Sequence, residues 1–378
     1  MRIAALAAFP FPAPLGSQVF VIEQLRALAK QGAQTTLFTY GSGTGPAPAE
    51  FEIRRIPAWT SPHRARAGPQ WRKPVADAAL LARFVVGARR KRFDLVLAHN
   101  AEAALIALAA RPVTGIPVVY VAHTLLAGEL ASYAPPVWQR LLDPLGAAID
   151  GLLARRADAV LALCRTAARQ LGRSARRPVA MIPPGLAVQA PPPETLQLQA
   201  CARFGLEPGR FALYAGNLDG YQGLEVLDGT AARLAQRGIR VVVATQSELP
   251  APNPALLSGA LTLARLPSFD EVRALCFAAG VLVLPRRLPG GFPIKLLNYM
   301  EAAKAIVAFE PVAGGLEHGR TAWILPGQAG STELALAIRT LLAEPARAAA
   351  LGRAARQHLL LHHDWQALAR QTLRLLRR

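Results

Sequence analysis

Residues 284–308 read LPRRLPGGFPIKLLNYMEAAKAIVA, and this stretch decides the fold of the second half of the chain. It leads from one predicted strand, through Gly290–Gly291 and a helix expected to open near Pro293, to a second predicted strand at Ala305–Ala308. Free backbone amides at a helix start attract anions, and Lys295 lies in the first predicted turn. The stretch predicts a phosphate-binding turn; the alternative is a plain loop and amphipathic helix with one solvent-facing lysine.

A second glycine-rich turn lies upstream, where residues 213–224 read LYAGNLDGYQGL. The predicted strand Phe211–Ala215 ends at Gly216 and opens into a polar turn before a helix. The turn suits a phosphate loop but lacks the glycine spacing of dinucleotide-binding folds. Neither NAD nor FAD is therefore predicted, and no cofactor is expected.

Short apolar runs alternate with longer amphipathic runs along the chain, which is typical of parallel sheets covered by helices. The fold class is therefore α/β, with two doubly wound Rossmann-like domains facing each other across a ligand-binding cleft. In the first half we predict strands at Arg2–Ala8, Thr35–Tyr40, Leu95–His99, Val118–Ala122, Ala159–Leu163 and Val179–Ile182, and helices at Gln18–Lys30 and Val75–Arg90. In the second half we predict strands at Phe211–Ala215, Arg240–Ala244, Leu261–Ala264, Val281–Leu284, Ala305–Ala308 and Thr321–Ile324.

A proline-rich stretch separates the two halves. Gln189–Glu194 contains three consecutive prolines and no apolar periodicity, which indicates a linker. We predict a first domain at residues 1–188, a linker at 189–205, a second domain at 206–360 and a C-terminal helix at 361–378. The tail from Leu334 to Arg378 is expected to be helical almost throughout.

Glycine and polar residues also follow predicted strands of the first half. Gly16 and Ser17 open the first helix, where glycine allows a ligand to approach the backbone, although a Gly-Ser turn that only caps a helix is equally common. His123 directly follows one strand, and His99 and Asn100 stand at the end of another. Such positions point into the predicted cleft, but His123 taken alone fits a structural histidine as well as a functional one.

Composition excludes several classes of protein. With 52% apolar and 18% charged residues, the chain is globular rather than disordered. No stretch reaches the roughly 18 apolar residues of a membrane span, and Met1–Phe9 is predicted as a buried strand rather than a signal peptide because prolines soon interrupt it. Cys164, Cys201 and Cys276 are scattered, and no histidines cluster at ligand spacing, so we predict no disulfide, no metal site and a reducing, cytoplasmic location.

The net charge of +19 raises the question of an anionic partner. Nucleic acid is not predicted, because the arginines are dispersed and lack interleaved aromatic residues. Ser61–Arg92 holds nine basic residues against one acid, Asp77, and fits either an anionic lipid surface or a solvated helix face. A peripheral contact with the inner face of the plasma membrane is our hypothesis. Val137–Arg156 adds apolar residues to it: Leu141, Leu142, Leu145, Ile149 and Leu152.

Taken together, these segments resemble glycosyltransferase family 4, whose members are retaining enzymes of the GT-B fold. The resemblance covers nearly the whole chain. It implies that a metal-independent enzyme transfers a hexosyl group from a nucleotide-sugar donor to a glycan or lipid-linked acceptor, which attacks on the face from which the diphosphate leaves. It also implies that the first domain lies on the acceptor side, that the second binds the donor, and that the last helix crosses back to the first. The segments that carry it are the loop at Gly16, the strand-end His123, IPPG at Ile182–Gly185, the turn at 213–224, the stretch at 284–308 and EHGRTA at Glu317–Ala322.

The resemblance also implies roles for single residues. His123 would contact the transferred sugar, Lys295 would stabilise the leaving diphosphate, and Asn298 would lie over the nucleotide ribose. Gly16 and Ser17 would lie against the diphosphate or sugar, and the loop from Gly290 would bind sugar hydroxyls and phosphates through backbone amides. The expected catalytic residues are His123 and Lys295, and the expected donor-binding residues are Gly16, Ser17, Gly216, Asn217, Gln222, Gly290, Gly291, Phe292, Pro293, Ile294 and Asn298.

The chain departs from the family pattern at polar positions. Gly290 and Asn298 stand where the family has an acidic pair, and Asn217 and Gln222 stand where an arginine and a lysine neutralise the leaving diphosphate. Without a metal, cations and amides must stabilise that charge. The alternative function is therefore a catalytically impaired nucleotide-sugar-binding protein or partner subunit. The local candidates to replace the lost charge are Lys295, Arg286 and Arg287.

Overall fold

The computed structural model describes residues 1–13, 15–62, 70–246 and 260–377. These residues form two compact α/β units. The first unit comprises Met1–Gly185, Gly290–Phe292 and Trp365–Arg378, and the second comprises Leu186–Pro289 and Pro293–Asp364. Residues 63–69 of the basic segment Ser61–Arg92 lie outside the described residues, and so does residue 14 of the loop before Gly16.

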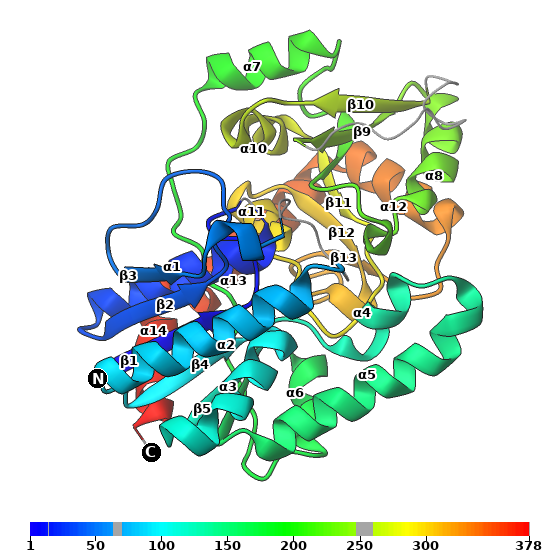
Figure 1. Cartoon of the computed structure of the whole chain (residues 1–378). Helices are drawn as coiled ribbons and strands as arrows, with labels where there is room; N and C mark the ends of the chain where they lie inside the picture. The colour runs from blue at the N-terminus through cyan, green and yellow to red at the C-terminus, as the bar shows by residue number, and fades with distance from the viewer. Residues whose placement is uncertain (14, 63–69, 247–259, 378) are drawn as a thin grey trace. The chain divides into compact units, whose positions relative to one another are not determined.

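A parallel sheet of seven strands forms the centre of the first unit. Its strands are β1 (Arg2–Ala7), β2 (Gln34–Thr39), β3 (Glu52–Arg55), β4 (Leu95–His99), β5 (Val118–Ala122), β6 (Ala159–Ala162) and β7 (Ala180–Met181). They lie in the order β3-β2-β1-β4-β5-β6-β7, so the chain winds outward in both directions from β1 and β4 (Figure 1). Every residue of β4 and β5 is buried, as expected for central strands with helices on both faces.

Helices cover this sheet on both faces. They are α1 (Gly16–Lys30), η1 (Ala58–Thr60), α2 (Lys73–Arg90), α3 (Asn100–Thr114), α4 (Leu126–Ser132), α5 (Pro136–Arg156), α6 (Arg165–Gly172) and α14 (Trp365–Leu376). Leu80 and Phe84 of α2 pack into the same core cluster as Tyr120 of β5, at helical spacing. Helix α2 lies beside α3, and α14 lies beside α1, where the amide nitrogen of Gln31 donates to Gln366 at 2.8 Å (Figure 1).

The second unit has its own parallel sheet, of six strands. Its strands are β8 (Phe211–Ala215), β9 (Arg240–Thr245), β10 (Leu261–Arg265), β11 (Val281–Leu284), β12 (Ala305–Phe309) and β13 (Trp323–Leu325). They lie in the order β10-β9-β8-β11-β12-β13. The helices around them are α7 (Glu194–Arg203), η2 (Gly220–Gln222), α8 (Glu225–Ala235), α10 (Phe269–Ala278), α11 (Lys295–Glu301), η3 (Glu310–Val312), α12 (Ser331–Ala343) and α13 (Pro345–His362).

A buried ion pair fixes the start of the second unit. Nε of Arg273, on α10, donates to Glu301, on α11, at 2.8 Å, and the two side chains are 7% and 3% exposed. The same guanidinium donates to the carbonyl oxygens of Ala190 and Gln189, and the amide of Gln189 donates to Glu301 at 2.8 Å. The proline-rich segment is therefore hydrogen-bonded to two helices rather than free of the fold.

The predicted fold class is confirmed, and the differences lie at the edges. Strand β3 was not predicted, because its sequence, EIRR, has one apolar residue and its side chains are only partly buried. Helix α7 occupies most of the expected linker 189–205 and packs against α10. Helix α11 begins at Lys295, two residues after Pro293, and the helical tail is interrupted at Glu344 and after His362. Among the described residues, no helix is both long and apolar enough to cross a membrane.

Candidate functional site

The topology of each sheet marks one edge for ligand binding. The strand order reverses between β1 and β4 in the first unit and between β8 and β11 in the second. Open α/β sheets bind ligands beyond the carboxyl ends of the strands at such points. His99 ends β4, and Gly216 follows β8 directly. His99 and the glycine turn at Gly216 therefore lie at the edges where such sheets bind ligands.

In the second unit, the motif residues form one hydrogen-bonded network around Lys295. Its ammonium donates to the phenol oxygen of Tyr214 at 2.5 Å and to the amide oxygen of Gln222 at 2.8 Å. The amide nitrogen of Gln222 donates to the side-chain oxygen of Asn217 at 2.6 Å, and Asn217 donates to Asp219 at 2.5 Å. Residues far apart in the sequence therefore hold one lysine at the end of β8.

Two glycines make this network sterically possible. A Cβ atom at residue 216 would collide with Nζ of Lys295 and would lie 3.0 Å from the Tyr214 hydroxyl. Gly223, which ends the turn, has a φ of +72°, and a Cβ there would lie 2.7 Å from the carbonyl oxygen of Pro285. The glycine spacing of the turn thus serves close packing against Lys295 and against the end of β11.

The electrostatics of Lys295 suit an anion. Burial lowers the pKa of Lys295 well below its usual range, the neighbouring Arg286 lowers it further, and Asp219 partly opposes them. An incoming phosphate would supply the negative charge that this desolvated ammonium lacks. The site should therefore bind most tightly a ligand that places negative charge next to Nζ of Lys295.

Three further side chains come from the segments next to Lys295: Tyr299, which was not predicted, and the expected arginines Arg286 and Arg287. The phenol oxygen of Tyr299 accepts a hydrogen bond from the amide of Ala215 at 2.8 Å and fixes α11 to the end of β8. The guanidinium of Arg286 lies 5.3 Å from the ring centre of Tyr221, beside the network. Arg287 instead stacks on Phe309 at 4.5 Å. Of the two expected arginines, Arg286 therefore lies beside this network, and Arg287 packs on Phe309 instead.

In the first unit, two histidines form a buried pair. Nδ1 of His99 and Nε2 of His123 are 3.1 Å apart, and the side chains are 0% and 4% exposed. Phe20 of α1 packs edge-on against His123 at 4.6 Å between ring centres, and Trp365 of α14 packs on Phe20 at 5.4 Å. His123 thus lies at a strand end as predicted, but the adjacent rings cover most of it.

The two imidazoles stay neutral at physiological pH. Burial lowers the pKa of His99 to about 3. Burial and the neighbouring His99 lower the pKa of His123 well below its usual range. Nε2 of His99 and Nδ1 of His123 are buried and have no hydrogen-bond partner among the described residues. A neutral His123 can orient a hydroxyl by a hydrogen bond, but it is a poor proton donor.

The remaining predicted residues are distributed over both units. Gly16 and Ser17 open α1, whose N-cap residue Leu15 provides no side-chain cap. The segment Gly290–Phe292 belongs to the first unit, and Gly290 has a φ of +90°. In the second unit, Pro293 and Ile294 precede α11, and Asn298 lies on that helix, half-buried. The structure brings Gly216, Asn217, Gln222 and Lys295 together.

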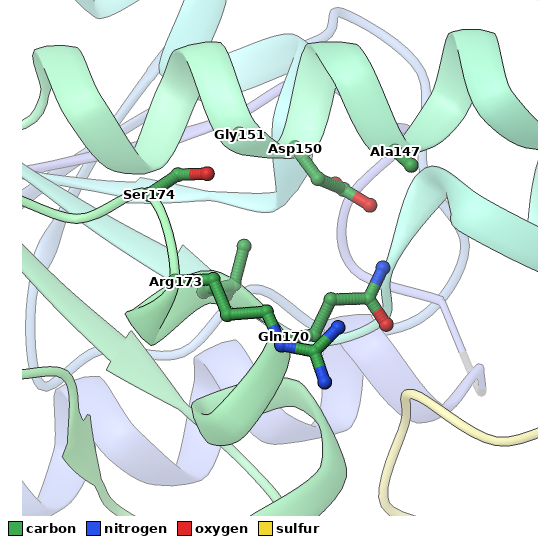
Figure 2. A pocket seen from close by; sticks show the side chains of 7 residues that line it. Ala147, Asp150, Gly151, Gln170, Arg173 and Ser174 are labelled. Carbon is green, nitrogen blue, oxygen red and sulfur yellow. The ribbon is translucent and has the colours of Figure 1, made fainter.

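Two cavities open in the first unit. One, of about 360 Å³, is lined by Asn100 and Thr124, which follow His99 and His123, and by residues of α2 and α4. The other, of about 330 Å³, lies between α5 and α6, with Asp150, Gln170 and Arg173 pointing toward it (Figure 2). Asp150 there accepts the amide of Ala127 at 3.0 Å and so holds the start of α4. The first cavity alone touches the strand ends.

The sequence missed several members of the two clusters. Tyr214 and Tyr299 have the apolar pattern of core residues, so nothing in the sequence distinguished them. Asp219 lies inside the quoted glycine turn, and its polar character was a usable signal. His99 had been noted as a strand-end residue, but only adjacent parallel strands place its ring beside His123. Among the described residues, no three His, Cys, Asp or Glu side chains are grouped as a metal site.

Comparison with known proteins agrees with both halves of the chain. The model of Glycosyltransferase Family 4 matches residues 15–189, and the model of Glycosyl transferases group 1 matches residues 209–344. No curated protein matches the sequence.

Solved structures resemble the whole chain. A sucrose-phosphate synthase from Thermosynechococcus elongatus has a TM-score of 0.81 at 19% identity, with 100% of this chain and 98% of that chain covered. HepE from Anabaena, in complex with UDP-glucose, has a TM-score of 0.72 at 16% identity, with 100% and 99% covered. WaaG, a glycosyltransferase involved in lipopolysaccharide biosynthesis, has a TM-score of 0.69 at 15% identity, with 99% of both chains covered. At these identities the likeness shows the fold, which is GT-B.

Proposed function

The chain is a glycosyltransferase of the family 4 type, and on that premise we propose that it transfers a hexosyl group from a nucleotide-sugar donor to a glycan or lipid-linked acceptor. The transfer retains the anomeric configuration and needs no metal. The donor's diphosphate binds at the carboxyl end of β8, in the second unit.

The Lys295 network carries this proposal. Asn217 and Gln222 lack the charge that a departing diphosphate requires, but their amides orient an ammonium at the same turn. Fixed charges and dipoles in a desolvated site stabilise developing charge without reorganisation. Lys295 therefore takes over the role of the missing cations. The solved complexes of HepE with UDP and UDP-glucose are consistent with a uridine donor.

The proposed reaction breaks the bond between the anomeric carbon and the leaving phosphate oxygen. The acceptor hydroxyl attacks on the same face, forms the new glycosidic bond, and gives its proton to the departing phosphate. Lys295 stabilises the charge on that phosphate. His123, neutral at physiological pH, orients a sugar hydroxyl and moves no proton.

Thermal stabilisation by UDP-, GDP-, ADP- and dTDP-sugars tests the donor class. A donor at 100 times its dissociation constant adds about 2.7 kcal/mol to the free energy of unfolding. We expect one nucleotide, UDP in the first place, to raise the melting temperature clearly. Turnover with that donor, followed by NMR of the product anomer with and without EDTA, tests retention and metal independence.

The alternative is a nucleotide-sugar-binding protein or partner subunit of low activity. The substituted positions Asn217, Gln222, Gly290 and Asn298 are the observation that favours it. It predicts donor stabilisation with no transfer to any glycan or lipid-linked acceptor. Stabilisation by none of the nucleotides would argue against both functions.

We also propose a cytoplasmic location with peripheral contact to an anionic membrane. Helix α5 exposes a row of apolar side chains: Val137 is 74% exposed, Leu141 62% and Leu145 50%. Such a row can lie at the level of lipid headgroups, and the net charge of +19 favours anionic lipid. Co-sedimentation with phosphatidylglycerol vesicles should drop when Leu141 and Leu145 are replaced by serine. Replacing Leu105, an exposed leucine of α3, should leave it unchanged.

A further inference from the structure

A small polar cavity lies between α5 and α6 of the first unit (Figure 2). Its volume of about 330 Å³ is near the lower end of the range for small-molecule pockets, roughly 300–1,000 Å³. The polar residues of its lining are Asp150 of α5, Gln170 of α6, and Arg173 and Ser174, which follow α6. None of them belongs to the proposed donor site, so the cavity is a separate place for a ligand.

Asp150 has an unpaired carboxylate oxygen. The residue is 1% exposed, and its side chain points toward the cavity (Figure 2). Oδ2 accepts the amide of Ala127 at 3.0 Å, whereas Oδ1 is buried and has no hydrogen-bond partner among the described residues. Buried polar atoms are normally hydrogen-bonded, because an unpaired one loses its hydration without compensation. A ligand that donates to Oδ1 would supply the missing hydrogen bond.

The other polar side chains of the lining offer hydrogen-bond donors. Gln170, Arg173 and Ser174 form no side-chain hydrogen bond or ion pair with the residues that the structure describes. Gly151 of α5 leaves room for Ser174, since a Cβ there would lie 3.0 Å from the Ser174 Oγ. A guanidinium has five N–H donors and binds phosphate oxygens in pairs, and the amide and the hydroxyl can add further donors. These groups together suit a phosphate.

The segment that supplies Arg173 is strongly basic. Residues 165–177 contain no Asp or Glu and five arginines, all exposed: Arg165, Arg169, Arg173, Arg176 and Arg177. None of these guanidiniums is in an ion pair with a described residue. Unpaired charges of one sign raise the local concentration of ions of the other sign. The surroundings therefore favour an anion and disfavour a ligand whose donor is an ammonium.

We propose that this cavity binds a phosphate ester of a small polyol, with the phosphate at Arg173 and a free hydroxyl donating to Oδ1 of Asp150. The guanidinium then meets an anion, and the unpaired carboxylate oxygen meets a neutral donor. An ammonium in place of the hydroxyl would also donate to Asp150, but the arginines would repel it. The site shares no residue with the donor site, so the inference does not depend on the proposed transfer.

Helix α5 indicates the source of such a ligand. A lipid headgroup and a free polyol phosphate share this chemistry. Asp150 follows Leu141 by nine residues, about two and a half turns, so the cavity lies on the other side of α5 from the exposed Leu141 and Leu145. If those leucines lie on a membrane, the cavity faces away from it. We therefore expect a free solute.

Isothermal titration of the full chain with sn-glycerol 3-phosphate, inorganic phosphate and phosphoethanolamine tests the ligand class. Glycerol 3-phosphate should bind about tenfold more tightly than phosphate, because it alone of the two also donates to the carboxylate of Asp150. It should also bind more tightly than phosphoethanolamine, which carries an ammonium. Equal affinity for phosphate and glycerol 3-phosphate, or no binding of glycerol 3-phosphate, would overturn the proposal.

Matched variants locate the site. Asp150→Asn places an amide donor where the unpaired acceptor stands, and it should abolish the preference of about tenfold for glycerol 3-phosphate without weakening phosphate. A purely structural effect would not act on the hydroxyl alone. Arg173→Met should weaken both ligands about tenfold, whereas Arg83→Met, at an exposed arginine of α2, should weaken neither. Because Arg173 is exposed, unchanged affinity in Arg173→Met would refute the assignment even if Asp150→Asn fails to fold.

Two further measurements separate this cavity from other anion sites. Lys295→Met should leave glycerol 3-phosphate binding unchanged, and its loss there would place the ligand at the donor network and overturn the proposal. Co-sedimentation with phosphatidylglycerol vesicles decides the source. Arg173→Met and Arg83→Met should reduce it equally, since each removes one charge. A selective loss in Arg173→Met would assign the cavity to the lipid headgroup and overturn the free solute.

Discussion

The strand ends of the two units carry different polar groups. In the second unit, Lys295 and Arg286 lie at the end of β8, and Gln222, held by Asn217, accepts a hydrogen bond from Lys295. In the first unit, the strand ends carry a neutral histidine pair and a cavity with carboxylates such as Glu129. One fold type, built twice in one chain, thus presents a lysine network at the strand ends of one unit and a histidine pair at the strand ends of the other.

The difference teaches that the ligand class depends on side chains at the strand ends rather than on the sheet. Both sheets reverse their strand order next to a central strand, between β1 and β4 in the first unit and between β8 and β11 in the second. A diphosphate suits the lysine network of the second unit, whereas the histidine pair of the first unit offers neutral imidazoles. Each of the following experiments tests either the lysine network or the histidine pair.

The largest effect is expected for Lys295→Met. Loss of one fixed charge at a developing anion typically lowers turnover about 10²- to 10³-fold, whereas binding of uridine, which has no phosphate, should change little. Steady-state kinetics and uridine titration measure the two. Lys30→Met, at the exposed end of α1, is the control. Turnover equal to that of the unaltered protein would remove Lys295 from the mechanism.

A second effect concerns stability in acid. The folded pKa of His99, about 3, lies below the value near 6.5 of an unfolded histidine, so the unfolded state binds more protons as pH falls below 6.5. The free energy of unfolding should therefore fall by about 1.4 kcal/mol per pH unit for each buried histidine. Urea unfolding between pH 5 and 7 measures the slope, and His99→Asn should reduce it. A flat profile would show that the pair is charged or solvated.

A smaller effect is expected for Gln222→Lys. This change introduces the cation usual in the family, but it places a second ammonium where Gln222 now accepts from Lys295 at 2.8 Å. Repulsion should lower turnover on the order of tenfold. Combining it with Lys295→Gln exchanges the two groups and should restore turnover to within a few-fold. Full activity of the single variant would mean that Lys295 and Gln222 do not act as a pair.

The smallest effect is a pH dependence of UDP affinity. Since the pKa of Lys295 is lowered in the free protein, a bound diphosphate should raise it and cause proton uptake. Affinity should therefore be highest at low pH and should weaken, by less than tenfold per unit, as pH rises through the free pKa. Isothermal titration in buffers of different ionisation enthalpy detects the proton. In Lys295→Met the uptake should vanish.

The sequence by itself determined the fold class and the two glycine turns. Alternating apolar runs gave both sheets, because central parallel strands are buried on both faces and read as continuous apolar segments. Gly216 and Lys295 were identified from turn chemistry and from a resemblance. Strand β3 and helix α7 escaped because neither has a strong apolar period, and their formation depends on the elements they pack against.

Only the tertiary structure decided what the strand-end residues do. Whether Lys295 is a solvated lysine or a desolvated ammonium depends on Tyr214 and Gln222, which are distant in sequence. The cavity at the ends of β4 and β5 gathers Asp77, Glu102 and Glu129 from α2, α3 and α4, and no spacing in the sequence relates them. The physical reason is that charge and hydrogen-bonding potential depend on distance and burial, which parallel-strand topology sets between residues far apart along the chain.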